Sequence, residues 1–454
     1  MNGLLIIACF VLVAVFMASR VLPTLLALPL LATAMAFCAG ISLQTYFNVI
    51  LLQGPLLLGS AMVVVVLGAL FARVMQRTGI SDSIIRTAAE LSGDNPFTLA
   101  FLLWLATVLV FMGMSGLGAI VMVGTIVLPL LTGAGIAPVK AVCLVLLGMQ
   151  VGLSLNTSFY ATFMGIFGGE IALAYLLPVV VIGVAGSLLF LVLNVPGAGL
   201  GPVISSLVTI SQAVVGLPLA LWRRFSQVQA SNNGLIIQPS QVPALAYAAP
   251  VVPILVVLTV KFTYGFQIQA GGLAPMAVAM LGFVVASLFA VLLTKPRQLL
   301  DIFAGAVVEG IRDVAGVIFL FMGIGMLALT VLQPETKSCL LPLLEAVLPE
   351  SVVGILAFFV VLAPAALYRG PLNMFGMGSG LAAVLVALGK IDAAALCGIF
   401  LAVAYVQTLC DPTNSHNTWL ADYAGVDTNQ VLQQLLPYAW GMCLVLAIYV
   451  ACWH

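Results

Sequence analysis

Charged residues are scarce in this sequence, and their scarcity excludes most classes of soluble protein. Only 6% of the 454 residues are charged, 14 basic and 14 acidic, whereas 63% are hydrophobic and the mean hydropathy is +1.27. A water-soluble domain carries about 25% charged residues. The formal net charge is zero and no basic tract occurs, so the sequence does not predict nucleic-acid binding.

Several metal-binding, catalytic and nucleotide-binding motifs are also missing. The eight cysteines occur singly, without CxxC or Cys/His spacing, so neither a disulfide framework nor a metal site is expected. The sequence contains no HExxH, no GxSxG and no nucleotide-binding motif. We therefore expect neither an enzyme nor transport driven by ATP through this chain alone, and we predict no cofactor apart from a possible bound Na⁺.

Long apolar runs recur from one end of the chain to the other. About 20 helical residues cross the hydrocarbon of a bilayer, and the alternating pattern of a transmembrane barrel is absent. The expected fold is therefore an all-α polytopic membrane protein. Ten crossings are predicted, near residues 3–19, 22–42, 51–75, 141–167, 171–194, 243–263, 272–293, 308–333, 393–419 and 434–452.

Two further apolar stretches, 97–132 and 351–388, are too long for one crossing. Met114–Gly118 interrupts the first and Tyr368–Asn373 interrupts the second. A re-entrant helical hairpin, which enters and leaves on the same side, accounts for both the length and the interruption. The alternative is a pair of ordinary helices joined by a tight turn outside the bilayer.

Basic residues predict the orientation, because Lys and Arg accumulate in cytoplasmic loops. With the N-terminus outside, the cytoplasmic side collects Arg20, Arg73, Arg77, Arg86, Lys140, Arg223, Arg224, Lys295 and Arg297. The outside receives only Lys261, Lys337 and Lys390. Both termini are therefore predicted outside a cytoplasmic (inner) membrane, with residues 1–19 as a retained helix rather than a cleaved signal.

The order of elements predicts two repeats, 1–194 and 243–454, each with three crossings, a hairpin, a broken crossing and a last crossing. Five crossings is an odd number, so the repeats are inverted provided that the cytoplasmic linker 195–242 does not cross. Its apolar part, 202–221, precedes Trp222-Arg223-Arg224 and is predicted as a surface helix. Inverted repeats with interrupted helices are typical of secondary transporters.

The broken crossings, 141–167 and 393–419, carry the polar residues that predict a binding site. One contains Asn156, Thr157 and Ser158, and the other runs from Asp411 to Asn417. Pro412 interrupts the helical ladder, and the exposed amides and hydroxyls can hold a solute or Na⁺. Asp411 and His416 are the candidates for ion or proton coupling. The alternatives are an ordinary loop capped by Asp411 and a hydrogen-bonding role for His416.

The hairpin interruptions supply the other candidates. Arg369 is costly in hydrocarbon, at about 2.5–3.5 kcal/mol or more, and its guanidinium fits a carboxylate in two parallel hydrogen bonds. A small organic anion is therefore the expected solute, unless Arg369 pairs with Asp411 or extends to the outer surface. The candidate substrate-binding residues are Ser115, Gly116, Asn156, Thr157, Ser158, Arg369, Gly370, Asn373, Thr413, Asn414 and Asn417. For Ser115 and Gly116, close helix packing is an equal alternative.

The layout resembles the ion transporter superfamily, within it the gluconate permease and citrate symporter branch. Gly68-Ala69-Leu70 leading into Gly79-Ile80, the paired hairpins and the two broken helices carry the resemblance. It implies a homodimeric carboxylate symporter that holds its solute between hairpin tips and broken helices. The triplets at 156–158 and 413–415 resemble the polar signatures of sodium-coupled members, in a different residue order, which implies Na⁺ near Asn156, Thr157, Thr413 and Asn414.

Phe111–Gly116 also resembles the large membrane subunit of binding-protein-dependent tripartite transporters, although the Gly-Xaa-Xaa-Thr-Pro-Pro run of that subunit is absent from the second half. The leading prediction is symport of a small carboxylate, such as a sugar acid, citrate or a C4-dicarboxylate, coupled to H⁺ or Na⁺. A Na⁺/H⁺-type antiporter, in which Asp411 exchanges the ions, and a tripartite subunit are the alternatives.

Overall fold

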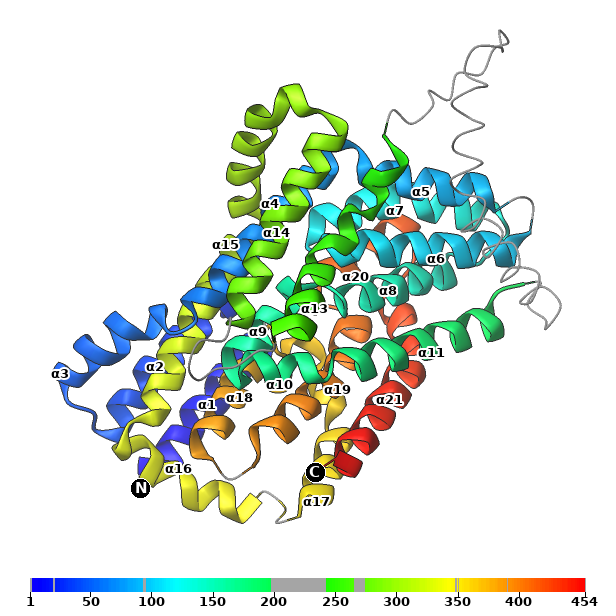
Figure 1. Cartoon of the computed structure of the whole chain (residues 1–454). Coiled ribbons are helices and arrows are strands. Elements are labelled where there is room, and N and C mark those ends of the chain that lie inside the picture. Colours follow the sequence, from blue (N-terminus) through cyan, green and yellow to red (C-terminus); the bar gives the residue numbers. More distant parts are fainter. Residues whose placement is uncertain are drawn as a thin grey trace, which may run out of the picture.

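The computed structural model describes residues 2–18, 21–92, 95–196, 242–264, 274–347, 349, 351–389 and 391–453. Within these ranges the secondary structure consists entirely of helices and turns, as predicted (Figure 1). The predicted surface helix at 202–221 lies outside the described residues.

The first half of the chain contains eleven α-helices with two short helical segments between α3 and α4. The α-helices are α1 Asn2–Ala18, α2 Thr24–Ala39, α3 Leu43–Thr45, α4 Gly59–Thr78, α5 Ile80–Leu91, α6 Pro96–Gly113, α7 Leu117–Gly133, α8 Pro138–Leu153, α9 Thr157–Phe167, α10 Gly169–Ala174 and α11 Leu176–Asn194. A π-helical turn, Tyr46–Leu51, and a 3₁₀ turn, Gly54–Leu56, lead into α4.

The second half begins with a 3₁₀ helix, η3 Ala244–Val251. It continues with α13 Val252–Tyr264, α14 Pro275–Thr294, η4 Pro296–Gln298, α15 Leu299–Leu332, α16 Pro334–Val347, α17 Val352–Val361, η5 Ala363–Arg369, α18 Gly378–Leu388, α19 Ala393–Cys410, α20 Ser415–Ala424 and α21 Thr428–Trp453.

Each predicted crossing overlaps at least one helix of the described chain. Within the described residues, eight helices are long and apolar enough to cross a membrane, or nine if a bent pair of helices forms one span. The bent pair is α8 and α9, which meet at 57°, at the predicted break. Two of the predicted crossings, α1 and α2, contain only shorter apolar helices. Conversely, α6 is an unbroken helix of 18 mainly apolar residues, so this arm of the first predicted hairpin is itself long enough to span.

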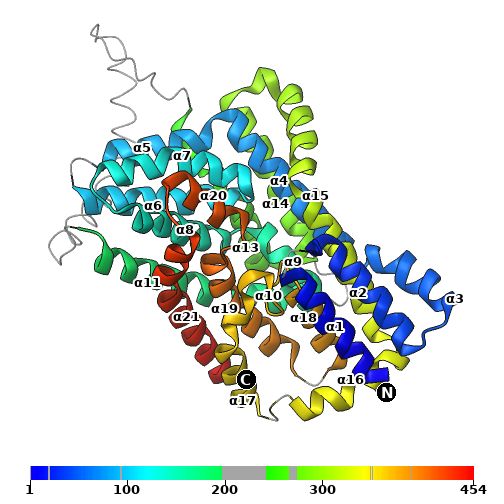
Figure 2. The same ribbon diagram turned by 180° about the vertical axis from the view of Figure 1, so that it is seen from behind.

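The long helices α4, α14 and α15 lie side by side in both views (Figures 1 and 2). Glycines allow their close approach: a Cβ on Gly310 of α15 would lie 2.9 Å from the backbone nitrogen of Leu70 on α4. Arg73 and Arg77 of α4 pair with Asp313 and Glu309 of α15, at 2.6 Å in each case. The close approach at a small residue and the two ion pairs thus join α4 to α15.

Helix α19 runs through the interior. The span Ala393–Ala424 has 89% of its most apolar window buried inside the protein, the largest share among the candidate spans of the described chain. Helices α8, α17 and α21 pack against α19. Because α19 ends at the second predicted break, that break is buried within protein rather than exposed to lipid, as irregular backbone at membrane depth requires.

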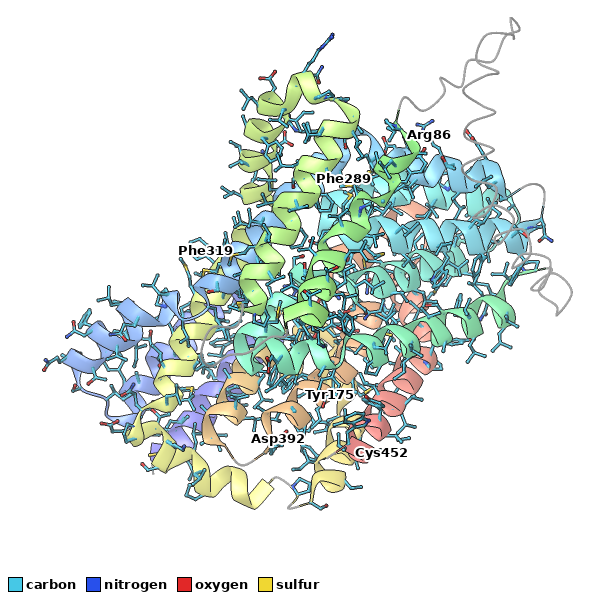
Figure 3. All side chains as sticks on the ribbon, viewed as in Figure 1. Arg86, Tyr175, Phe289, Phe319, Asp392 and Cys452 are labelled. Atoms are coloured by element: carbon cyan, nitrogen blue, oxygen red, sulfur yellow. The ribbon has the colours of Figure 1, made fainter. Side chains whose placement is uncertain are left out.

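The two termini share one edge of the molecule. The N- and C-termini both lie at the lower edge of Figure 1. Arg86 lies near the upper edge of Figure 3, opposite Asp392 and Cys452. This arrangement agrees with the basic-residue pattern; which side faces the cytoplasm stays a prediction.

Candidate functional site

Asn156 ties the first broken helix to the turn of the first hairpin. It caps α9, and its side-chain oxygen accepts hydrogen bonds from the amide (2.9 Å) and the hydroxyl (2.7 Å) of Ser158. Its Nδ2 donates to the carbonyls of Phe111 (3.1 Å) and Met114 (3.2 Å), where α6 ends. The Asn156 side chain is buried, so these four bonds satisfy polar groups that water cannot reach.

Asp411 has the corresponding place in the second broken helix. Its carboxylate is fully buried and accepts five hydrogen bonds. Thr413 donates its amide (2.9 Å) and hydroxyl (2.7 Å), Asn373 donates Nδ2 (3.0 Å), and Tyr368 and Arg369 each donate a backbone amide (3.0 Å). Asp411 therefore braces the second hairpin and does not pair with the Arg369 guanidinium.

This brace holds a strained turn. Tyr368 and Arg369 have φ values of 56° and 55°, the only non-glycine residues with positive φ in the described chain. Each such residue costs on the order of 1–3 kcal/mol and persists only where its surroundings fix it. Here the Asp411 carboxylate supplies acceptors to both amides. Gly370 follows, where a Cβ would lie 2.1 Å from the carbonyl oxygen of Ala365, so the turn closes tightly.

A cavity of about 200 Å³ lies between the two broken helices, the first hairpin turn and the helices α4 and α15. Five of the predicted site residues line it: Ser115, Gly116, Ser158, Asn414 and His416. Its other lining residues are Val65, Ala69, Ala72, Phe111, Met149, Leu153, Phe159, Thr162, Asp313, Val314, Val317, Phe375, Gln407 and Thr408. The cavity wall thus contains segments from both halves of the chain.

Three helix N-termini contribute to this cavity. Gly116 precedes α7, Ser158 lies in the first turn of α9, and Asn414 precedes α20. The first amides of a helix have no intrahelical acceptor, and the N-terminus carries a partial positive charge of roughly half an elementary charge. The cavity therefore lies where three such ends favour negative charge.

Polar side chains that the sequence analysis did not select also face the cavity. Thr162, Gln407 and Thr408 are each at least nine-tenths buried, and within the described chain the Thr162 and Thr408 hydroxyls and Gln407 Nε2 have no hydrogen-bond partner. The Oε1 of Gln407 accepts from the Met374 amide at 2.7 Å, which fixes its amide group. The sequence offered only a weak signal for these residues: each is a polar residue in an apolar run near a break, with Thr162 after the first break and Gln407 and Thr408 before the second.

The other predicted residues lie outside the cavity wall. Asn373 bonds to Asp411 and to the Ala366 carbonyl, Thr413 bonds to Asp411, and Asn417 donates to the carbonyls of Leu409 and Asp411. Thr157 is buried with an unpartnered hydroxyl. Arg369 is partly buried, and its guanidinium has no carboxylate partner in the described chain.

Neither ionisable group on the wall is isolated. Asp313 forms a bidentate pair with Arg73, with N···O distances of 2.6 and 2.7 Å, so its charge is compensated. His416 Nε2 lies 3.2 Å from the Thr408 carbonyl. The described residues contain no group of three His, Cys, Asp or Glu side chains that could hold a metal ion.

The sequence matches no protein-family model, and no curated protein matches it. Among solved structures, the fold is similar to that of the YdaH transporter of Alcanivorax borkumensis, which is described as having an unusual topology. The TM-score is 0.55 and the sequence identity 15%, over 100% of this chain and 98% of the other. At this identity the likeness concerns the fold: the chain has the fold of a polytopic membrane transporter.

Proposed function

We propose that the protein is a secondary active transporter that moves a small organic anion by alternating access. The observation that supports this most directly is the cavity at which three helix N-termini meet three unpartnered side-chain groups. Transporters bind solutes between interrupted helices whose N-termini face anionic groups. Transport by a protein with the YdaH fold agrees with the proposal.

The lining favours an organic anion over an inorganic one. Gln407 Nε2 and the threonine hydroxyls can donate to a carboxylate. The rings of Phe111, Phe159 and Phe375 supply an apolar wall. The volume of about 200 Å³ is below the roughly 300–1,000 Å³ of pockets for drug-sized ligands, so the solute is small.

We further propose Na⁺ rather than H⁺ as the coupling ion. Both oxygens of Asp411 already accept from N–H or O–H donors, and a proton on either oxygen would meet one of them. In contrast, the buried oxygens of Gln150, Thr157 and Asn417 have no partner within the described chain. Side-chain oxygens of this kind are suitable ligands for a dehydrated Na⁺. Among the residues that the family resemblance implied for Na⁺, Thr157 is the one whose side chain remains uncommitted.

The test uses protein in liposomes and a variant that changes one atom on the cavity wall. Thr408→Val replaces an unpartnered hydroxyl with a methyl group of similar size. A lost hydrogen bond to a charged group costs about 1.5–3 kcal/mol, so we expect the apparent affinity for the solute to fall at least tenfold at unchanged thermal stability. Thr107→Val is the matched control, because the Thr107 hydroxyl bonds only to its own helix at the Leu103 carbonyl.

Gluconate, citrate, C4-dicarboxylates and inorganic anions are compared with and without Na⁺ at two pH values. A carboxylate that is taken up only with Na⁺ and is weakened by Thr408→Val supports the proposal. Na⁺ flux driven by a pH gradient, without any organic solute and insensitive to Thr408→Val, would contradict it and support the antiporter.

A further inference from the structure

A second hollow, far larger than the central cavity, lies on the surface between α11 and α21. It has a volume of about 940 Å³ and is lined mainly by apolar side chains. The two helices lie side by side in both views (Figures 1 and 2) and belong to candidate membrane spans. The lining residues, here called the α11–α21 groove, are Val181, Ile182, Ala185, Gly186, Leu189, Leu193, Gln433, Gln434, Pro437, Tyr438, Gly441, Met442 and Val445.

One end of the groove is polar. The Nε2 of Gln434 donates to Asn194 Oδ1 at 3.1 Å, and Asn194 Nδ2 donates to the Tyr438 hydroxyl at 2.9 Å. Lys140 Nζ donates to the Asn194 carbonyl at 3.1 Å, which places an ammonium group at this end. An ammonium group has three donors, and the described chain supplies an acceptor for one of them.

Two glycines, one on each helix, shape the rest of the groove. A Cβ on Gly441 would meet no atom within 4 Å, whereas a Cβ on Gly186 would lie 2.4 Å from the Met442 sulfur. Gly186 thus permits the two helices to approach, and Gly441 leaves room above their contact. The result is an apolar channel that begins at a cationic polar end.

We propose that the α11–α21 groove binds one anionic phospholipid, with an acyl chain along Gly441 and the phosphate at Lys140. In a bilayer, the apolar groove alone cannot select an occupant, because lipid tails are as apolar as its walls. Charge provides the selection: the phosphate supplies acceptors for the free donors of Lys140, and basic pockets between membrane helices bind such head groups. Tyr438 lies at the same end, as aromatic residues at membrane interfaces do.

The experiment is native mass spectrometry of the detergent-purified full chain, titrated with phosphatidylglycerol or phosphatidylcholine of identical acyl chains. A basic residue near a membrane surface contributes about 1 kcal/mol toward an anionic lipid, so we expect roughly fivefold tighter binding of the first phosphatidylglycerol. Lys140→Gln should abolish this preference and Lys140→Arg should keep it. Equal binding of both lipids by the wild type, or an unchanged preference in Lys140→Gln, would overturn the proposal.

A second variant tests the groove itself. Gly441→Leu places a side chain where a Cβ would meet no atom within 4 Å, and it should weaken the binding of the first lipid of either type at least fivefold. Leu444→Phe is the matched control, since Leu444 is on α21, is 48% exposed and does not line the groove. Unchanged lipid binding by Gly441→Leu would overturn the proposal, and a simultaneous shift from dimer to monomer would assign the groove to a second copy of the chain. None of these outcomes depends on the transported solute.

Discussion

Replacing Asp411 with Asn tests whether this carboxylate braces the second hairpin. The change preserves shape but turns one acceptor oxygen into an NH₂ donor. At the Oδ2 position the new group would face the Arg369 amide and Asn373 Nδ2, and at Oδ1 it would face three donors. At least two buried donors therefore lose their acceptor, at about 1–3 kcal/mol each, so we expect a loss of roughly 2–6 kcal/mol.

The measurement is the apparent unfolding temperature in detergent at one fixed scan rate, because membrane proteins of this size often unfold irreversibly. Thr413→Val removes one of the five donors and leaves the carboxylate intact, so its loss should be smaller, about 1.5–3 kcal/mol for a single hydrogen bond to a charged group. Asp427→Asn is the control. Asp427 is exposed and accepts through one oxygen, from Asn429, which an Asn side chain preserves.

The expected order of unfolding temperatures is control, Thr413→Val, then Asp411→Asn at the lowest value. If Asp411→Asn unfolds with the control, the carboxylate does not hold the Tyr368–Arg369 turn and the argument fails. Coupling to protons through Asp411 would then become the better interpretation, to be tested by the pH dependence of uptake in the same variant.

Three further changes follow from the same contacts. Asn156→Asp places an oxygen against the Phe111 and Met114 carbonyls, so we expect a lower unfolding temperature than that of the wild type. Adding Asp411→Asn should not restore it, and a double variant that unfolds at the wild-type temperature would refute this. Gly152→Val should destabilise the protein by about 1–3 kcal/mol or more, because a Cβ there would lie 2.6 Å from the Val108 carbonyl oxygen. Gly59→Ala is the control, since a Cβ on Gly59 would meet no atom within 4 Å. Equal unfolding temperatures for the two variants would contradict the prediction. Arg77→Gln breaks an ion pair with Glu309 in which both side chains are more than a third exposed. The loss of stability should therefore be under about 1 kcal/mol and should vanish in 1 M salt. A larger loss of stability that persists in salt would show that Arg77 acts through packing.

Much of the architecture follows from the sequence because a bilayer restricts the chain so strongly. Hydrocarbon allows only backbone that satisfies itself, so apolar runs of 20 residues predict helices, and polar or glycine-rich interruptions predict breaks. Both hairpin turns and both broken helices occur where these interruptions stand, at 114–116, 154–156, 362–377 and 411–414. Whether α1 and α2, with 17 and 16 helical residues, each cross the membrane stays a prediction.

The roles of the polar residues were decided only by the tertiary structure. The sequence places Asn156, Asp411 and Thr413 at the breaks, but it cannot say whether their side chains face a solute or the backbone of a neighbouring hairpin. Interrupted helices create buried orphan amides and carbonyls, and the nearest side chains satisfy them first. Groups left without partners become available to a ligand. Those that face the cavity belong to Thr162, Gln407 and Thr408, which lie within helices and which helix packing alone turns toward the cavity.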